Sequence, residues 1–292
     1  MKRYVSLSLL LCLLIAAAAT LAAQSNTQPP PKVLVVSREY LKPGKSGSPH
    51  QKTESMFAQA MAAAKWPSHY LGADSLTGPS RSIFFTGYPS MDAWGKDVAA
   101  ASSNPTLGPA LDRAFIADGE LLTSIDTNVF VYREDLSFNA NVDIAHMRYF
   151  DVSIFKARPG HEMELEALAK MYVDNYVKAN PDAHWATYQQ MYGAHSGGVY
   201  VVFNPIKSLA EVDTGMGSDK KFAEVMGESG MKKMAELSAA STESVESQLL
   251  AFNPAISYPS DEWIKADPGF WKPKAAAPAK KADAKPAAKP AQ

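Results

Sequence analysis

Cysteine is almost absent from this sequence: its 292 residues include one, Cys12. Cys12 lies in an apolar stretch near the N-terminus. If that stretch is removed, the remaining chain has no disulfide, no thiolate nucleophile and no cysteine ligand for a metal ion. A chain of this length buries enough apolar surface to fold without disulfide bonds.

Motifs for common cofactors and catalytic sites are also missing. The sequence contains no glycine-rich dinucleotide or phosphate loop and no Gly-x-Ser-x-Gly nucleophile motif. None of its histidines forms a His-x-x-His or His-Glu-x-x-His pair, which is the spacing typical of zinc sites. The histidines are His50, His69, His146, His161, His184 and His195. We therefore predict no metal site and no cofactor.

Positive charge is scarce outside the two ends. The formal net charge is −1. Loss of Lys2 and Arg3 with the leader lowers it to −3, and the tail at 272–292 has six lysines against Asp283, a net +5. The body between them therefore carries about −8, whereas nucleic-acid binding needs clustered lysine and arginine. This charge balance argues against a nucleic-acid partner.

The N-terminus has the pattern of a signal peptide. Two basic residues precede an apolar run, and small residues then allow cleavage after Ala22 or Ala23. We predict an exported protein, periplasmic or secreted, from a bacterium. An uncleaved membrane anchor is the alternative, because the run is just long enough to span a bilayer. A lipoprotein is disfavoured, because Cys12 follows leucines rather than a small residue.

An internal repeat organises the body. The Pro-Gly pairs that end at Gly44 and Gly160 are 116 residues apart, and so are Pro89 and Pro205 at the ends of two aromatic segments. Two landmarks with one offset indicate a duplication. The predicted segments are a signal peptide at 1–23, an arm at 24–31, a first unit at 32–135, a linker at 136–145, a second unit at 146–258, an aromatic extension at 259–271 and a tail at 272–292.

Each unit has the same pattern of elements. A strand (33–40 or 148–156) ends at the Pro-Gly turn and precedes an amphipathic helix, a hairpin, a second helical region and a closing strand. Ser90 and Ser208 are the predicted N-caps of the second helical regions. The order β-α-β-β-α-β is the ferredoxin-like split unit, which makes the fold class α+β.

This order and these turns resemble the dimeric α/β-barrel superfamily, which includes antibiotic-biosynthesis-monooxygenase-like and NIPSNAP-like domains. The resemblance implies two ferredoxin-like units with sheets packed face to face around a cavity. Because both units belong to one chain, a single molecule can form the pair, and a monomer is plausible. Some relatives bind haem through a helix histidine, but no residue here matches that ligand. Fold alone does not identify function.

Successive side chains of a strand point to opposite faces of the sheet, and this alternation indicates which residues could face a cavity. We expect Phe150, Val152 and Ile154 to face the helices. The alternate series should then face the cavity between the sheets; it comprises Val33, Val35, Ser37 and Glu39 in the first unit and Tyr149, Asp151, Ser153 and Phe155 in the second. Glu39 and Asp151 are the candidate catalytic bases. The alternative is an exposed Glu39 and an Asp151 paired with a cation or a backbone group.

Further residues are candidates for ligand binding. Tyrosines and amides suit the orientation of a small polar or aromatic molecule. The candidate ligand-binding residues are Tyr149, Ser153, Tyr188, Gln189 and Tyr200, with Gln190 beside them on the second hairpin. As ordinary strand residues they need no such role. The second unit is the more polar, and we expect it to hold any site.

Two segments with different compositions follow the second unit. The segment 261–271 contains Trp263, Phe270 and Trp271, and we expect it to pack on the body, because exposed tryptophan is unfavourable. The Lys/Ala/Pro tail cannot form a core and is predicted to be disordered. Its charge suits weak contact with anionic envelope polymers or lipids, or simple solubilisation.

Three functions are consistent with these features. The first is an exported protein that binds a small apolar or aromatic molecule in a barrel cavity. The second is a cofactor-independent monooxygenase or isomerase that uses a cavity carboxylate or histidine as base. The third is a structural or interaction protein of the cell envelope. A cavity with a base inside it favours the second, and a lumen filled with side chains disfavours the first two.

Overall fold

The computed structural model describes residues 27–194 and 197–272. The predicted signal peptide lies outside these residues, as do His195 and almost all of the predicted tail. Within the described ranges, no helix combines the length and the hydropathy that a bilayer span requires.

The first unit alternates strands and helices in the predicted order, with its second helical region divided in two. Its elements are β1 (Val33–Leu41), α2 (Ser48–Ala63), β2 (Tyr70–Ser75), β3 (Arg81–Tyr88), α3 (Met91–Ser103), α4 (Leu107–Gly119) and β4 (Leu122–Tyr132). Two short 3₁₀ turns, Glu134–Leu136 and Ile144–His146, lead to the second unit.

The second unit repeats this order. Its elements are β5 (Tyr149–Ala157), α5 (Glu162–Ala179), β6 (Ala186–Tyr192), β7 (Val199–Ile206), α6 (Ala210–Met216), α7 (Ser218–Ser241) and β8 (Thr242–Phe252). A 3₁₀ turn at Pro254–Ile256 and the short helices α8 (Asp261–Ala266) and α9 (Pro268–Trp271) follow.

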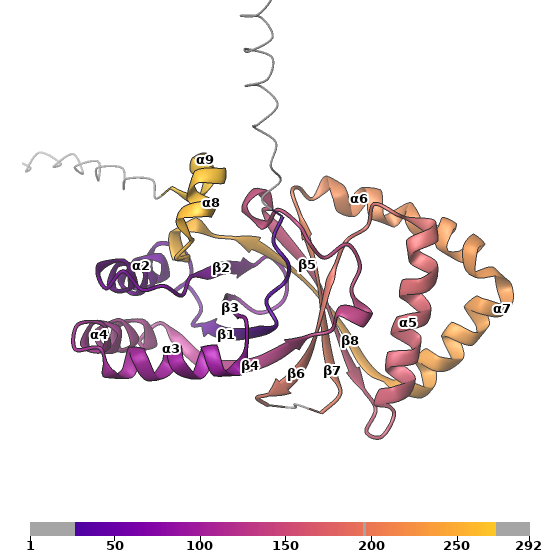
Figure 1. Ribbon diagram of the computed structural model, residues 1–292, viewed down its shortest axis with the longest axis horizontal. Helices are drawn as coiled ribbons and strands as arrows, with labels where there is room; N and C mark the ends of the chain where they lie inside the picture. The colour runs from indigo at the N-terminus through magenta and orange to yellow at the C-terminus, as the bar shows by residue number, and fades with distance from the viewer. Residues whose placement is uncertain (1–26, 195–196, 273–292) are drawn as a thin grey trace, which may run out of the picture.

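The eight strands close into one barrel in the order β1-β3-β2-β8-β5-β7-β6-β4. Each unit contributes four neighbouring strands, and the two seams are the antiparallel pairs β2–β8 and β4–β6. The helices lie outside the barrel, with α2, α3 and α4 on one side and α5, α6 and α7 on the other (Figure 1). This topology confirms the predicted fold class: two ferredoxin-like units forming a dimeric α/β barrel within one chain.

The two units match in detail at the repeat landmarks. The pairing of β1 with β4 shifts register between Tyr40 and Leu41, and the equivalent pairing of β5 with β8 shifts register between Lys156 and Ala157. The glycine that ends each Pro-Gly turn has positive φ, 75° at Gly44 and 83° at Gly160. A side chain with a Cβ is strained in that conformation, so the turn requires glycine in both units.

The lumen of the barrel is filled with apolar side chains from every strand. Its aromatic centre has Phe150 against Phe85, Phe203 and Phe252, with ring centroids 5.4, 5.4 and 4.7 Å away. Val152 and Ile154 belong to the same cluster. The predicted direction of β5 is therefore wrong: Phe150, Val152 and Ile154 face the lumen and not the helices. A closed eight-stranded barrel has room for packed side chains and little else, so the more apolar series occupies it.

The aromatic extension packs on the body, as predicted. Trp271 is fully buried, and its indole N–H donates a hydrogen bond to the carbonyl of Ala145 at 2.7 Å. Its ring lies against those of Phe252 and Trp263. The extension therefore packs on the barrel core.

Only one of the two predicted N-caps forms. The Ser90 hydroxyl accepts a hydrogen bond from the backbone N–H of Ala93 at the start of α3. The prediction for Ser208 is wrong, because α6 begins at Ala210 after Leu209, with no side-chain cap. Glu211 instead accepts a hydrogen bond from the backbone N–H of Lys207, which satisfies a donor in the preceding turn.

Candidate functional site

A cavity of about 990 Å³ lies between the second unit's sheet and its helices. We call it the unit 2 cavity. Strands β5 and β7 form its floor, with Asp151, Ser153 and Tyr200 among the floor residues, and α5, α6 and α7 form its roof. The alternate series of β5 thus does line a cavity. That cavity lies on the helix side of the sheet and not between the two sheets, where it was expected.

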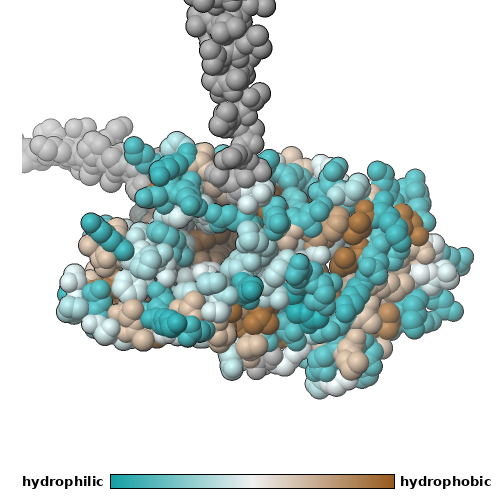
Figure 2. All heavy atoms as spheres, viewed as in Figure 1, coloured by the Kyte–Doolittle hydropathy of each residue, from teal (hydrophilic) through white to brown (hydrophobic). Residues whose placement is uncertain are grey.

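The roof of the unit 2 cavity is largely aromatic and methionine-rich. Tyr172 and Tyr176 on α5 are stacked with ring centroids 4.9 Å apart, and Tyr176 meets Trp185 edge-on at 5.9 Å. Met231 and Met234 on α7 complete this wall. Figure 2 shows hydrophobic side chains reaching the surface beside α5. Such walls suit a flat apolar or aromatic molecule, because aromatic rings stack on it and methionine adapts to its shape.

Asp151 is the carboxylate on the floor of this cavity; those of Glu166, Asp182, Glu211 and Asp219 line it from the helices and the connections beside them. Partial burial raises the pKa of the Asp151 side chain above the usual aspartate range. Within the described residues, no side chain or backbone group donates a hydrogen bond to it and no cation pairs with it. Asn204 lies directly opposite on β7 and also lines the cavity. An apolar pocket with a few unpaired polar groups is the usual form of a small-molecule site.

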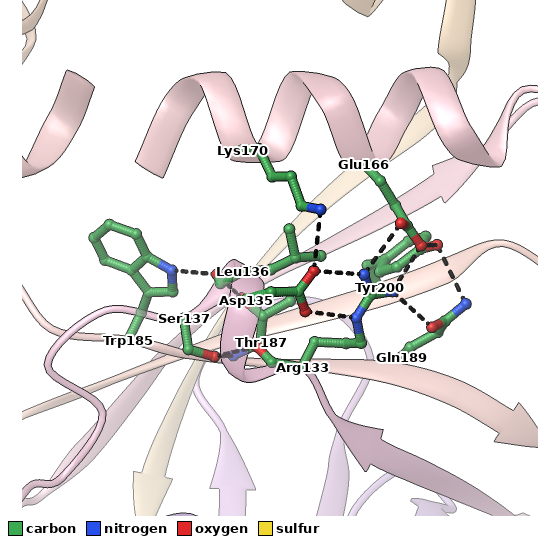
Figure 3. Close-up of polar contacts among 10 residues, drawn as sticks. All are labelled: Arg133, Asp135, Leu136, Ser137, Glu166, Lys170, Trp185, Thr187, Gln189 and Tyr200. Atoms are coloured by element: carbon green, nitrogen blue, oxygen red, sulfur yellow. Dashed lines mark hydrogen bonds and ion pairs between the residues drawn. The ribbon is translucent and has the colours of Figure 1, made fainter. Parts of the chain in front are cut away.

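A polar network, which we call the Arg133 clasp, lies at one side of the cavity (Figure 3). Arg133 follows β4, and its guanidinium donates two hydrogen bonds to Asp135, at 2.9 Å each, and two to Glu166 on α5, at 2.6 and 3.1 Å. A fifth bond of 2.9 Å reaches the side-chain oxygen of Gln189 on β6. The hydroxyl of Tyr200 donates to Glu166 at 2.7 Å.

The clasp joins the two units and leaves no donor of Arg133 for a ligand. A guanidinium has five N–H groups, and each has an acceptor here. Lys170 adds an ion pair with Asp135 at 3.4 Å. Next to it, the indole of Trp185 and the hydroxyl of Thr187 both donate to the carbonyl of Leu136 (Figure 3). We therefore assign the clasp a structural role.

The structure brings only some of the predicted ligand-binding residues together. Ser153 and Tyr200 line the unit 2 cavity, and Gln189 holds Arg133 and the Tyr200 hydroxyl. Tyr188 points into the barrel, where its hydroxyl donates to the carbonyl of Pro31 at 3.0 Å. Tyr149 is not among the residues that line this cavity. Gln190 bonds to Asn128 and the carbonyl of Ala194.

A second cavity, of about 900 Å³, opens at one end of the barrel. Lumen residues Phe85 and Tyr188 form its floor, and Trp66 and Trp263 line its sides. Some of its polar groups have partners within the protein: Asp97 accepts hydrogen bonds from Ser68 and Tyr88. Others do not: His69 Nδ1 and the hydroxyl of Tyr70 are buried and have no hydrogen-bond partner among the described residues. What distinguishes the unit 2 cavity from this mouth cavity is the carboxylate of raised pKa, Asp151, on its floor.

Glu39, the other predicted base, lies in neither cavity. It points from β1 towards the helices and is buried beside His50, Glu54 and Asp118. Burial raises its pKa, and desolvation together with the neighbouring Glu39 and Asp118 raises the pKa of Glu54 to about 10. The expected alternative of an exposed Glu39 is wrong, because helices α2 and α4 cover this end of β1. His50 and Glu54 were missed, although their i, i+4 spacing places both on one face of a helix.

The unit 2 cavity does not present a histidine ligand for haem. Of the described residues that line it, His184 is the only histidine, and its Nε2–H donates to the carbonyl of Pro205 at 2.6 Å. That bond holds the imidazole against β7. Since no other described imidazole lines the cavity, its residues do not fit haem held by a histidine.

Comparison with known proteins adds resemblance at the level of architecture. No protein-family model matches the sequence, and no curated protein matches it significantly. Among solved structures, an anthrone oxidase-like protein has a TM-score of 0.49 at 14% identity, over 76% of this chain and 92% of that one. A chlorite dismutase mutant from Candidatus Nitrospira defluvii has a TM-score of 0.46 at 9% identity, over 81% and 95%. The strand order of the chain itself, and not these scores, establishes the barrel.

Proposed function

We propose that this protein binds a small apolar or aromatic molecule in the unit 2 cavity. The observation that carries the proposal is a cavity of about 990 Å³ with aromatic and methionine walls and one unpaired carboxylate, Asp151, on its floor. Its volume lies near the upper end of the range found for small-molecule sites. Side chains pack the aromatic centre of the barrel, and the mouth cavity opens beside them.

Asp151 and Asn204 define the polar end of such a ligand. Because the pKa of Asp151 is raised, its carboxyl takes up a proton more readily than an exposed aspartate does. It can then donate a hydrogen bond to a carbonyl or accept one from a hydroxyl. A hydroxylated or keto-substituted aromatic ring therefore matches both the walls and the floor.

A pair of tryptophan substitutions on α5 tests this proposal. Ala169 lines the cavity, whereas Ala167 on the same helix is exposed. We expect native mass spectrometry of the protein from its own source to show a bound compound. The protein freed of that compound should bind a fluorescent apolar dye such as anilinonaphthalene sulfonate. Ala169→Trp should weaken dye binding at least tenfold by filling the cavity, and Ala167→Trp should leave it unchanged. Equal binding by both variants would contradict the proposal.

Catalysis is the second candidate, and the desolvated carboxyl of Asp151 is the observation that favours it. An aspartate of raised pKa next to a bound C–H acid can act as general base. Once the bound compound is identified, exchange of its acidic hydrogen in deuterated water tests this role. Asp151→Asn should retain binding and abolish exchange, and exchange that continues unchanged in this variant would leave binding as the function.

A further inference from the structure

Four buried side chains from three elements of the first unit meet behind its sheet. Glu39 comes from β1, His50 and Glu54 from α2, and Asp118 from α4. One nitrogen or oxygen atom of each lies within 4.8 Å of those of the other three. Their exposed fractions are only 2–5%. The cluster is separate from the unit 2 cavity, which belongs to the other half of the molecule.

Hydrogen bonds behind His50 orient its ring. The hydroxyl of Ser82 donates to the carboxylate of Asp74 at 2.5 Å, so its oxygen is left to accept from Nδ1–H of His50 at 3.4 Å. Asn253 holds the other oxygen of Asp74 at 2.6 Å. Nε2 of His50 lies within hydrogen-bond distance of Glu39 Oε2, at 3.0 Å. With a metal ion bound at Nε2, the proton of the ring would lie on Nδ1, and this chain of bonds would hold it there.

The Nε2 atom of His50 faces the three carboxylates. Its Nε2 lies 3.0 Å from Glu39 Oε2, 3.5 Å from Asp118 Oδ1 and 3.7 Å from Glu54 Oε1. With the ring proton on Nδ1 and the three carboxylates ionised, all four atoms are electron-pair donors. Such a group of donors repels itself in a dry interior unless protons or a cation lie between its members.

No other charge in the described part of the chain compensates for these carboxylates. His50 is their only ion-pair partner there, since neither lysine nor arginine reaches them. Glu54 Oε1 is fully buried and has no hydrogen-bond partner among the described residues. A buried, unpaired carboxylate oxygen is costly, and its presence calls for a partner. The atom points into the cluster, where a bound cation would supply that partner.

We propose that Glu39, His50, Glu54 and Asp118 bind a divalent first-row transition-metal ion, of which Zn²⁺ and Mn²⁺ are the representatives to test. One imidazole with three carboxylates is a mixed nitrogen and oxygen donor set, which suits these ions better than Ca²⁺ or Mg²⁺. Carboxylate ligands also offset the charge of the ion: two ionised carboxylates neutralise a divalent cation, and a third leaves the site with a net charge of −1.

The spacing of the four atoms matches a metal centre. Nitrogen and oxygen ligands about 2.0–2.2 Å from a tetrahedral ion lie about 3.3–3.6 Å from one another. The three distances from His50 Nε2, 3.0–3.7 Å, bracket this value. Thr53 further orients Asp118 with a hydrogen bond of 2.6 Å to its Oδ1. Small side-chain shifts are enough to form the site.

Metal analysis of the untagged full chain tests the proposal. The protein is stripped by chelator under denaturing conditions and refolded with or without Zn²⁺ or Mn²⁺, because the cluster is buried. We expect one equivalent of metal per chain by plasma mass spectrometry, and a higher melting temperature with metal. Glu54→Gln should weaken metal binding at least tenfold. Glu120→Gln is the matched control: it makes the same change at an exposed residue two positions from Asp118, and it should leave metal binding unchanged.

Cobalt provides a readout that needs no variant. Co²⁺ bound by one imidazole and carboxylates in four-coordinate geometry absorbs visible light, and Zn²⁺ should displace it and abolish the band. If Glu54→Gln fails to fold, the metal stoichiometry and the Co²⁺ spectrum of the unsubstituted chain still test whether the cluster binds metal. Failure of the folded chain to take up stoichiometric Zn²⁺, Mn²⁺ or Co²⁺ would overturn the proposal, as would wild-type affinity in folded Glu54→Gln.

Discussion

Gly72 in β2 occupies a position that no larger residue fits. A Cβ there would lie 2.6 Å from both the side chain and the carbonyl oxygen of Ile256, in the 3₁₀ turn after β8. The backbone N–H of Gly72 also donates to the hydroxyl of Ser257, and its carbonyl accepts from the backbone N–H of Asn253. The absence of a side chain at Gly72 therefore allows the turn to lie against the sheet.

Substitution of Gly72 should destabilise the protein more than substitution of a glycine that has free space around it. We expect Gly72→Ala to lower the free energy of unfolding by about 1–3 kcal/mol, because a backbone atom must move to admit the methyl group. Gly95→Ala is the matched control: Gly95 lies within α3 with nothing near the new Cβ, and helix propensity predicts a gain of about 0.5–1 kcal/mol. Urea unfolding of both variants measures the difference, and equal effects would contradict this account of the turn.

Among the elements, the Arg133 clasp connects the end of β4 to α5 and β6. Its acid dependence follows from Asp135, whose pKa is lowered from 3.8 to about 2, chiefly by hydrogen bonds from Arg133. Well above pH 3.8 the aspartate is charged in the folded and the unfolded chain, and its contribution to stability is complete. As the pH falls from about 4 towards 2, the unfolded chain takes up the proton first, so that contribution is lost.

Acid titration of stability tests the clasp. Asp135→Asn should lose stability less steeply than the wild type between about pH 4 and 2, because it no longer has this proton to take up. The side chain is partly exposed, so salt should reduce the difference. Asp112→Asn, at an exposed aspartate on α4 outside the clasp, should keep the wild-type slope. Identical slopes for wild type and Asp135→Asn would show that the pair is too weakly coupled to matter.

The whole molecule depends on closure of the barrel by both units. Strands β2 and β4 at the edges of the first unit pair with β8 and β6 of the second. The lumen core draws on both units, with Phe85 from the first against Phe150 and Phe203 from the second. Separation of the units would expose two strand edges and half of the core.

We therefore expect the full chain to unfold in a single cooperative transition. Residues 32–135 expressed alone should not form a folded monomer, because their lumen face would lie in water. Calorimetry of the full chain, with circular dichroism and size-exclusion chromatography of the isolated unit, provides the measurements. A stable monomeric first unit with native-like sheet content would contradict this interpretation.

The sequence by itself determined the repeat and the order of elements. Both depend on interactions between residues that are close in the sequence. Turn glycines such as Gly44 and Gly160 and the alternation of apolar and polar residues can therefore be recognised without a structure. The tryptophans of the extension likewise predicted its burial, since the cost of exposing an indole does not depend on the fold. Export and the role of the tail stay predictions, because they concern residues outside the described ranges.

The tertiary structure alone decided which strand face is interior and which distant groups meet. Phe150 and Asp151 alternate in one strand, and only barrel closure selects the apolar series for the lumen. That choice moved the candidate cavity to the helix side and left Asp151 on its floor. Glu39 and Asp118 are far apart in the chain, and only the packing of α2 and α4 on β1 brings them to His50. The spacing of residues in the sequence could not reveal this cluster, because its members come from three elements. The pKa of a buried group also depends on its neighbours in space, which the sequence does not show.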